Sequence, residues 1–289
     1  MKQLFCSFLG VLASAILSAC TAPPIPTTEI PVTATATNTL IVASPSQTAT
    51  PSLTSTSSPM ASSSPTLTAS PTLTPTPIVT PTPDGLPDMP DKPVPQSSTF
   101  QGCPPVGDGG DSKLNMLKNR IDEGNYVPVT FDAIFNLTWP KTTEQRPMNT
   151  WSAEDAAAIA KYEGIPVVVE GFLVRAKKSG SESANCHGTA ADMTDWHVWF
   201  TKTAGEDRTH SIVIETTPRI RALHHWTLAM LGQIAVNQIP VRIGGWLFFD
   251  PEHPDQINLT RGTIWEIDPV MQIEVLQNGQ WVPLDDFVP

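Results

Sequence analysis

A long stretch rich in proline, threonine and serine fills the first third of this chain and limits what that third can fold into. Of the 30 prolines among the 289 residues, 17 lie between Pro23 and Pro95, whereas all eight Trp and both Tyr lie beyond residue 120. A segment this poor in large apolar side chains cannot bury a core, and Pro-Thr repeats favour extended, hydrated polyproline II. We therefore predict a disordered tether over residues 20–98 and one globular domain over residues 99–289.

The first twenty residues predict export. Lys2 precedes an uncharged apolar run that ends at residue 17, a length that suits a signal peptide and is short for a membrane span. The Leu-Ser-Ala-Cys sequence at residues 17–20 resembles a bacterial lipobox. The resemblance implies a lipoprotein signal peptide over residues 1–19 and a lipidated Cys20, which anchors the protein on the extracytoplasmic side of a bacterial membrane. An ordinary secretory signal that contains a cysteine is the alternative.

The charge of the predicted domain weighs against nucleic acid as a partner. From residue 98 onward the sequence contains 24 acidic and 15 basic residues, in a chain of net charge −11. A protein that binds nucleic acid through its phosphates needs a positive surface. Besides the membrane, the expected partner is therefore a glycan, a peptide or a protein of the cell envelope.

The periodicity of the domain predicts mainly β structure with some helix. Helices are expected over residues 112–122, capped by Asp111 or Ser112, and after the cap Ser152. In the first helix, periodicity places Lys118 and Arg120 mostly on the solvent side. Strands are predicted at residues 167–174, 196–200, 211–215, 241–249 and 263–267, with residues 271–275 close behind. A helical stretch lies between the third and fourth strands, and this is the order of the five-stranded OB-fold barrel. We therefore predict an OB-like barrel over about residues 165–277, elaborated by an N-terminal helical and irregular section.

Two stretches also resemble known bacterial proteins. Residues 163–171, with Gly171 in the first strand, resemble the start of that strand in bacterial secreted OB domains. Residues 244–256 and 260–267, which end in Thr-Ile-Trp-Glu-Ile, resemble an uncharacterised family of bacterial OB-fold-like proteins. The resemblance covers about residues 102–285 and implies the fold without an activity. Relatives have a histidine after the Glu-Ile step, where this chain has Asp268, so any role of that histidine is absent here.

Aromatic side chains on one face of the barrel are the first candidate for a ligand site. Strand alternation predicts that Phe172, Trp199, Arg242 and Trp246 share an outward face. OB-folds bind oligonucleotides or oligosaccharides on platforms of this kind. His253, in an acidic turn after the fourth strand, is a further candidate because OB-fold binding loops lie there. The alternative is that the N-terminal section packs over this face and buries its aromatic residues.

A group of candidate metal ligands is the second possibility. Its members lie within twelve residues and are Cys186, His187, Asp195 and His197. Thiolate, imidazole and carboxylate are ligands that zinc accepts, although the spacing matches no established zinc motif. With zinc bound, Glu170 or Glu215 would act as a base toward metal-bound water, and the protein would be a metal-dependent hydrolase. A solvated surface histidine is the alternative, and the sequence requires no cofactor.

Cys103 and Cys186 are the only cysteines after Cys20. An even number in an oxidising compartment predicts a disulfide between the N-terminal section and the loop after the first barrel strand. This bridge competes with the metal site, because a bridged Cys186 cannot bind an ion.

The sequence therefore predicts a membrane-anchored envelope lipoprotein with an OB-like domain that binds a ligand or partner, without catalysis. The metal-dependent hydrolase is the alternative, and a purely structural envelope component is a third possibility.

Overall fold

The structure is a computed structural model, and it describes residues 85–288. The predicted signal peptide, the lipidation site Cys20 and residues 20–84 of the predicted tether lie outside the described residues. Within residues 85–288, no helix has the length and apolar character needed to cross a membrane.

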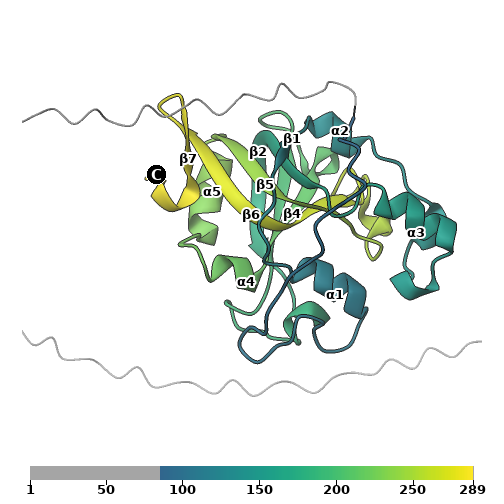
Figure 1. Cartoon of the computed structure of the whole chain (residues 1–289). Helices are drawn as coiled ribbons and strands as arrows, with labels where there is room; N and C mark the ends of the chain where they lie inside the picture. The colour runs from purple at the N-terminus through teal and green to yellow at the C-terminus, as the bar shows by residue number, and fades with distance from the viewer. Residues whose placement is uncertain (1–84, 289) are drawn as a thin grey trace, which may run out of the picture. The chain divides into compact units, whose positions relative to one another are not determined.

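Five strands close into a barrel (Figure 1). They are β2 (Pro166–Lys178), β3 (Trp196–Thr201), β4 (Ile212–Thr216), β5 (Pro240–Phe249) and β6 (Trp265–Gln277). Neighbours pair in the order β2-β3-β4-β6-β5, and β5 pairs back onto β2 to close the barrel. The β4–β6 pair is parallel and the other pairs are antiparallel. This is the connectivity of an OB barrel, so the predicted fold class is confirmed.

The first barrel strand belongs to both halves of the barrel. Its N-terminal part pairs with β5 and its C-terminal part with β3, and the partner changes at Phe172, which lies opposite both Thr201 and Pro240. Gly171 stands at this change, because a Cβ there would collide with the backbone oxygen of Thr201 and the ring of Phe200. The mid-strand glycine therefore permits the close approach that lets one strand join both halves.

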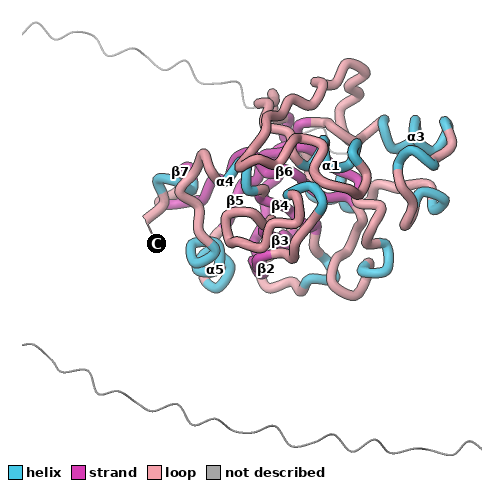
Figure 2. The backbone as a smooth tube through the Cα atoms, turned by 90° about the horizontal axis from the view of Figure 1, so that it is seen from below, coloured by secondary structure: helices cyan, strands magenta, loops and turns pink. Residues whose placement is uncertain are grey.

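Two short strands and several helices complete the domain. β1 (Val127–Pro128) pairs in parallel with β2, and β7 (Gln280–Pro283) pairs antiparallel with β6. The α-helices lie around the strands (Figure 2) and are α1 (Ser112–Lys118), α2 (Phe131–Phe135), α3 (Ala153–Ala160), α4 (Pro218–Arg221) and α5 (Leu228–Val236). Short 3-10 turns are η1 (Lys141–Thr143), η2 (Met148–Thr150), η3 (Ser183–Asn185), η4 (Arg208–His210), η5 (Pro254–Gln256) and η6 (Leu284–Asp286).

Local sequence explains where the helices begin. The Asp111 side chain accepts hydrogen bonds from the first backbone N–H groups of α1, and Ser152 caps α3 in the same way. The helical stretch predicted between the third and fourth barrel strands is present but divided into α4 and α5. Helix α5 packs against β2 and buries Leu231 and Ile234, so it closes one side of the core.

The globular domain begins earlier than the predicted boundary at residue 99. Leu86 and Met89 pack against the hydrophobic core, and the Ile121 N–H donates a hydrogen bond to the carbonyl of Gln96. Proline and polar residues dominate this stretch, and for that reason the sequence predicts it to be part of the tether. Its few apolar side chains nevertheless find room on the barrel.

Candidate functional site

The predicted aromatic platform does not form. Trp246 is 1% exposed and Trp199 is 4% exposed, so neither offers a free ring face. The N-terminal section covers Trp246, because the Arg120 guanidinium lies 3.3 Å from its ring centroid and Tyr126 meets the ring edge-on. The aromatic candidates therefore serve packing, as the alternative interpretation of this face expected.

The other platform residues also have structural partners. Arg242 pairs with Glu170 at 2.7 Å and with Glu274 at 3.4 Å, and its guanidinium lies over the ring of Trp281. Phe172 is half-buried at the point where β2 changes partner. Of the predicted ligand-binding residues, His253 alone lines the cavity described below.

The predicted metal ligands do not converge either. Cys186 forms a disulfide with Cys103, with their Cα atoms 5.7 Å apart, and so offers no thiolate. The Nε2 atom of His187 hydrogen-bonds the carbonyl oxygen of Asp108. The set of four is therefore wrong as a metal site, because the disulfide and the turn after η3 separate Cys186 and His187 from the other two.

The remaining two predicted ligands belong to a larger buried group, which we call the ionic cluster. Its residues come from α1, the segment before η3, the start of β3, β4, the loop after β5, and β6. They are Lys118, Glu182, Asp195, His197, Glu215, Asp250, His253, Arg261, Glu266 and Asp268. Six carboxyl groups therefore face four basic side chains.

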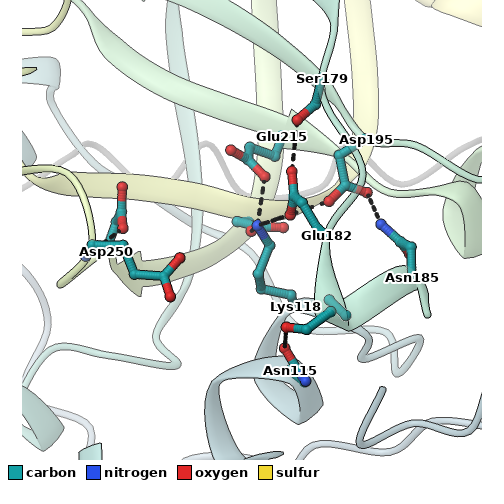
Figure 3. Close-up of polar contacts among 12 residues, drawn as sticks. Asn115, Lys118, Ser179, Glu182, Asn185, Asp195, Glu215 and Asp250 are labelled. Atoms are coloured by element: carbon teal, nitrogen blue, oxygen red, sulfur yellow. Dashed lines mark hydrogen bonds and ion pairs between the residues drawn. The ribbon is translucent and has the colours of Figure 1, made fainter. Parts of the chain in front are cut away.

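Lys118 is the centre of one half of the ionic cluster (Figure 3). Its Nζ lies 2.8 Å from Oε2 of Glu182 and 3.0 Å from Oε2 of Glu215. Oδ2 of Asp195 and Oδ2 of Asp268 follow at 3.8 and 3.7 Å. Figure 3 shows the side chain reaching from α1 into this group of carboxylates. One ammonium thus holds four acidic side chains together.

The Glu182 and Glu215 carboxylates also face His197. Nε2 of His197 lies 2.8 Å from Oε1 of Glu215 and 3.7 Å from Oε1 of Glu182. His197 and Glu215 are opposite each other in the β3–β4 register, so the sheet itself fixes this pair. The Ser179 hydroxyl donates a hydrogen bond to Oε1 of Glu182. Each glutamate therefore bridges Lys118 and His197.

Arg261 organises the other half of the ionic cluster. Its Nη1 donates to Oδ2 of Asp250 at 2.7 Å and to Oε1 of Glu266. Nδ1 of His253 lies 2.8 Å from the same Asp250 oxygen. Arg261 and Glu266 are buried, whereas His253 is on the rim, so this half runs from the interior to the surface.

The charge state of the central pair follows from its neighbours. Burial disfavours the ionised form of Glu215, but His197 and Lys118 outweigh it and lower the pKa of Glu215 to about 2. Burial likewise disfavours a charged imidazole, yet Glu215 and Glu182 raise the pKa of His197 to about 10. An imidazolium and a carboxylate therefore face each other at neutral pH.

Other carboxyl groups of the ionic cluster keep their protons. Burial and then repulsion from Glu182 raise the pKa of Asp195 to about 8, against the attraction of Lys118. Burial also raises the pKa of Glu266 and Asp268 well above the usual range. The cluster contains more acids than bases, and protons on Asp195, Glu266 and Asp268 remove the excess negative charge.

A cavity of about 240 Å³ opens onto the ionic cluster. Its lining residues are Leu114, Lys118, Ser179, Glu182, His197, Glu215, Phe248, Asp250, Glu252, His253 and Glu266. A second hollow of about 530 Å³, lined by Arg146 among others, shares Leu114 and Glu252 with it. The buried carboxylates are therefore reachable from a groove on the surface.

Several polar atoms in the ionic cluster make no hydrogen bond with any residue in the described part of the chain. Both carboxylate oxygens of Asp268 are in this state, and its side chain has no exposed surface. The same holds for Oε2 of Glu215, Oδ2 of Asp195 and Nε2 of His197, whose ion-pair contacts lack hydrogen-bond geometry. Unsatisfied buried polar groups are costly, so their concentration beside a cavity points to a ligand.

Two groups of three side chains in the ionic cluster could share a metal ion. They are Glu182 with His197 and Glu215, and Glu215 with Glu266 and Asp268, and in each group the ligand atoms lie within 4.8 Å of one another. All three residues of the first group line the cavity, whereas Asp268 of the second does not. The first group is therefore the accessible one.

Sequence reasoning missed the central residue. Lys118 is predicted on the solvent side of its helix, yet the end of α1 abuts the barrel and leaves it 9% exposed. A signal that could have found the site is the presence of acidic residues inside otherwise apolar strands. Glu215 and Glu266 are such residues, and a strand buried on both faces has no wet side for them.

The chain matches no protein-family model, no curated protein and no solved structure. The chemistry of the ionic cluster therefore carries the functional argument.

Proposed function

We propose that this protein is a lipid-anchored binding protein of the bacterial cell envelope, and that its OB-like domain takes a small, positively charged ligand in the cavity beside Lys118. The surplus of buried carboxyl groups carries this proposal. Six carboxyl groups face four basic side chains, and three of the six have raised pKa values because burial and mutual repulsion favour their protonated forms. A cation that enters the cavity replaces protons that the acids otherwise hold.

The size of the cavity supports a small ligand. A volume of about 240 Å³ corresponds to about eight water molecules at ~30 Å³ each. A glycan or peptide can therefore insert one cationic group and must place the rest along the neighbouring groove. Nucleic acid fits poorly, because buried carboxylates repel phosphate.

The four metal ligands on which the hydrolase alternative depended do not come together. Cys186 is bridged to Cys103, and His187 is turned toward the carbonyl of Asp108. His197 is retained, but with Glu182 and Glu215 as its neighbours. The geometry gives binding of a cation a physical basis and assigns no reaction to the site.

The anchor is tested by labelling cells with an alkyne analogue of palmitate. We expect the label on the wild-type protein and none on Cys20→Ala, because Cys20 is the cysteine in the lipobox-like sequence. Cys6→Ala, in the same N-terminal segment, is the matched control and should stay labelled. Label retained on Cys20→Ala contradicts the anchor.

Ligand binding is tested by native mass spectrometry of the full-length protein purified in detergent. We expect an additional bound mass in the wild type that is lost in Glu215→Gln. Glu274→Gln is the matched control, because Glu274 pairs with Arg242 outside the ionic cluster. A bound mass that persists in Glu215→Gln, or no bound mass at all, would count against the cavity as the site.

A further inference from the structure

Three ligand atoms in the cavity are already spaced for a metal ion. Nε2 of His197 lies 2.8 Å from Oε1 of Glu215 and 3.7 Å from Oε1 of Glu182, and one ligand atom from each of the three residues lies within 4.8 Å of the other two. Ligands at ~2.0–2.1 Å from a tetrahedral zinc ion are separated by about 3.3 Å. The observed distances bracket this value, so small side-chain rotations bring all three atoms onto one ion.

The three side chains are held in place by independent structure. His197 and Glu215 are paired across the β3–β4 sheet. Lys118 binds the Oε2 atoms of Glu182 and Glu215, which leaves both Oε1 atoms directed toward His197. Lys118 is therefore a positioning residue: it orients the carboxylates so that Oε1 of each faces His197, and the Ser179 hydroxyl also donates to Oε1 of Glu182.

The ion pairs alone do not explain the ionic cluster. A structural lysine needs one or two carboxylates, whereas four surround Lys118 within 4 Å. Both oxygens of the fully buried Asp268, which faces the same group, make no hydrogen bond within residues 85–288. These unsatisfied atoms are independent of the triad spacing and point to a missing positive partner.

We infer that the cavity binds one divalent transition-metal ion of the zinc type through Glu182, His197 and Glu215. The inference rests on the proposed function, since the metal is then the positively charged ligand. One imidazole and two carboxylates suit zinc and its neighbours. The cavity leaves room for water at the remaining coordination position. The ligand set contains no sulfur, because Cys186 is in a disulfide.

The test is isothermal titration of the full-length protein in detergent, after removal of metals with a chelator, with Zn²⁺, Mn²⁺ and Ca²⁺ in turn. We expect one zinc ion per chain and at least a 100-fold loss of zinc affinity in His197→Gln. His210→Gln is the matched control, because His210 is exposed and pairs only with Asp207 among the residues that the structure describes. Its zinc affinity should equal that of the wild type.

A second variant distinguishes the loss of a metal ligand from misfolding of His197→Gln. Glu182 lies on the segment before η3 and is half-buried, so Glu182→Gln should keep the near-ultraviolet circular dichroism of the wild type and still lose at least tenfold in zinc affinity. Unchanged affinity in this folded variant overturns the inference. Binding of calcium in preference to zinc also overturns it, because calcium takes oxygen ligands and leaves His197 without a role.

The same data separate the two proposals. If no metal binds but native mass spectrometry shows a mass that Glu215→Gln loses, the cavity binds another cation and the metal inference falls alone. If neither metal nor mass is found, both fall.

Discussion

Lys118 and Arg120 are two residues apart and both buried, yet their surroundings differ in charge balance. Arg120 has one carboxylate partner, Asp122, which accepts from Nε at 3.1 Å and from Nη2 at 2.6 Å, and the guanidinium lies on the Trp246 ring. Lys118 has four carboxylates within 4 Å. The Arg120–Asp122 pair is balanced and hydrogen-bonded, whereas Lys118 is surrounded by more acidic groups than it can neutralise.

This difference in charge balance suits Arg120 to a structural role and the surroundings of Lys118 to a binding site. A buried cation with one partner and a stacked ring fastens the N-terminal section to the barrel and needs nothing more. A buried cation among surplus acids leaves some of those acids to hold protons, and a second positive group can take the place of these protons. Shifted pKa values gather around Lys118 for this reason, and such clusters are typical of binding sites.

The largest expected effect comes from removing the central cation. Lys118→Met should lower the free energy of unfolding by about 4 kcal/mol at pH 8, because four acids lose their shared ammonium. The loss should shrink near pH 4, where the orphaned carboxyl groups accept protons and cease to repel one another. Urea unfolding at both pH values measures it. An equal loss at pH 4 and pH 8 would show that packing of the lysine stem, not charge, dominates.

The disulfide comes next, because it fastens the segment that carries Glu182. Replacing both Cys103 and Cys186 with alanine should cost about 3 kcal/mol, since the bridge closes a long loop in the unfolded chain. Zinc affinity should also fall, as Glu182 loses its fixed position. Dithiothreitol should reproduce both effects in the wild type and leave the double variant unchanged. Full affinity in the double variant would show that Lys118 alone positions Glu182.

The balanced region should respond differently. Arg120→Met keeps an apolar stem over Trp246 but leaves Asp122 with the Gln96 N–H and without its charged partner, so we expect a loss of about 2 kcal/mol in unfolding free energy. Zinc affinity should remain within twofold of the wild type, because Arg120 touches no residue of the metal triad. Paired urea and titration experiments check this. A tenfold loss of affinity would mean that the two regions are coupled through α1.

The two regions also show which features of the fold and the site the sequence could predict. Strand order, the caps Asp111 and Ser152 and the need for Gly171 depend on local pattern and chain order, so the OB barrel could be predicted. Whether a barrel face is exposed depends on contacts with a segment that is far away in sequence. Strand alternation therefore predicts Trp246 on an exposed platform, whereas in the structure the Arg120 guanidinium covers its ring. Helical periodicity predicts Lys118 on the solvent side of α1, because it carries no information about which end of the barrel the helix packs against.

The last expected effect is a gain in stability, and it lies at Glu163, an acid near Arg120. Its Oε1 has no hydrogen-bond partner among residues 85–288. Burial raises the pKa of Glu163 from 4.5 to about 7, although Lys113, Lys92 and Arg120 partly oppose the rise. An acid whose pKa is raised by folding contributes fully below its unfolded pKa, and the contribution is lost as pH rises through 7.

Glu163→Gln removes this ionisation. The variant should match the wild type near pH 4 and exceed its unfolding free energy by about 2 kcal/mol at pH 8, since the wild type must then bury a charge. Glu154→Gln, on the exposed side of α3, is the matched control and should follow the wild type at both pH values. If Glu163→Gln gains nothing at pH 8, the basic neighbours already neutralise the Glu163 carboxylate, and burial without a close basic partner does not by itself destabilise an acid in this domain.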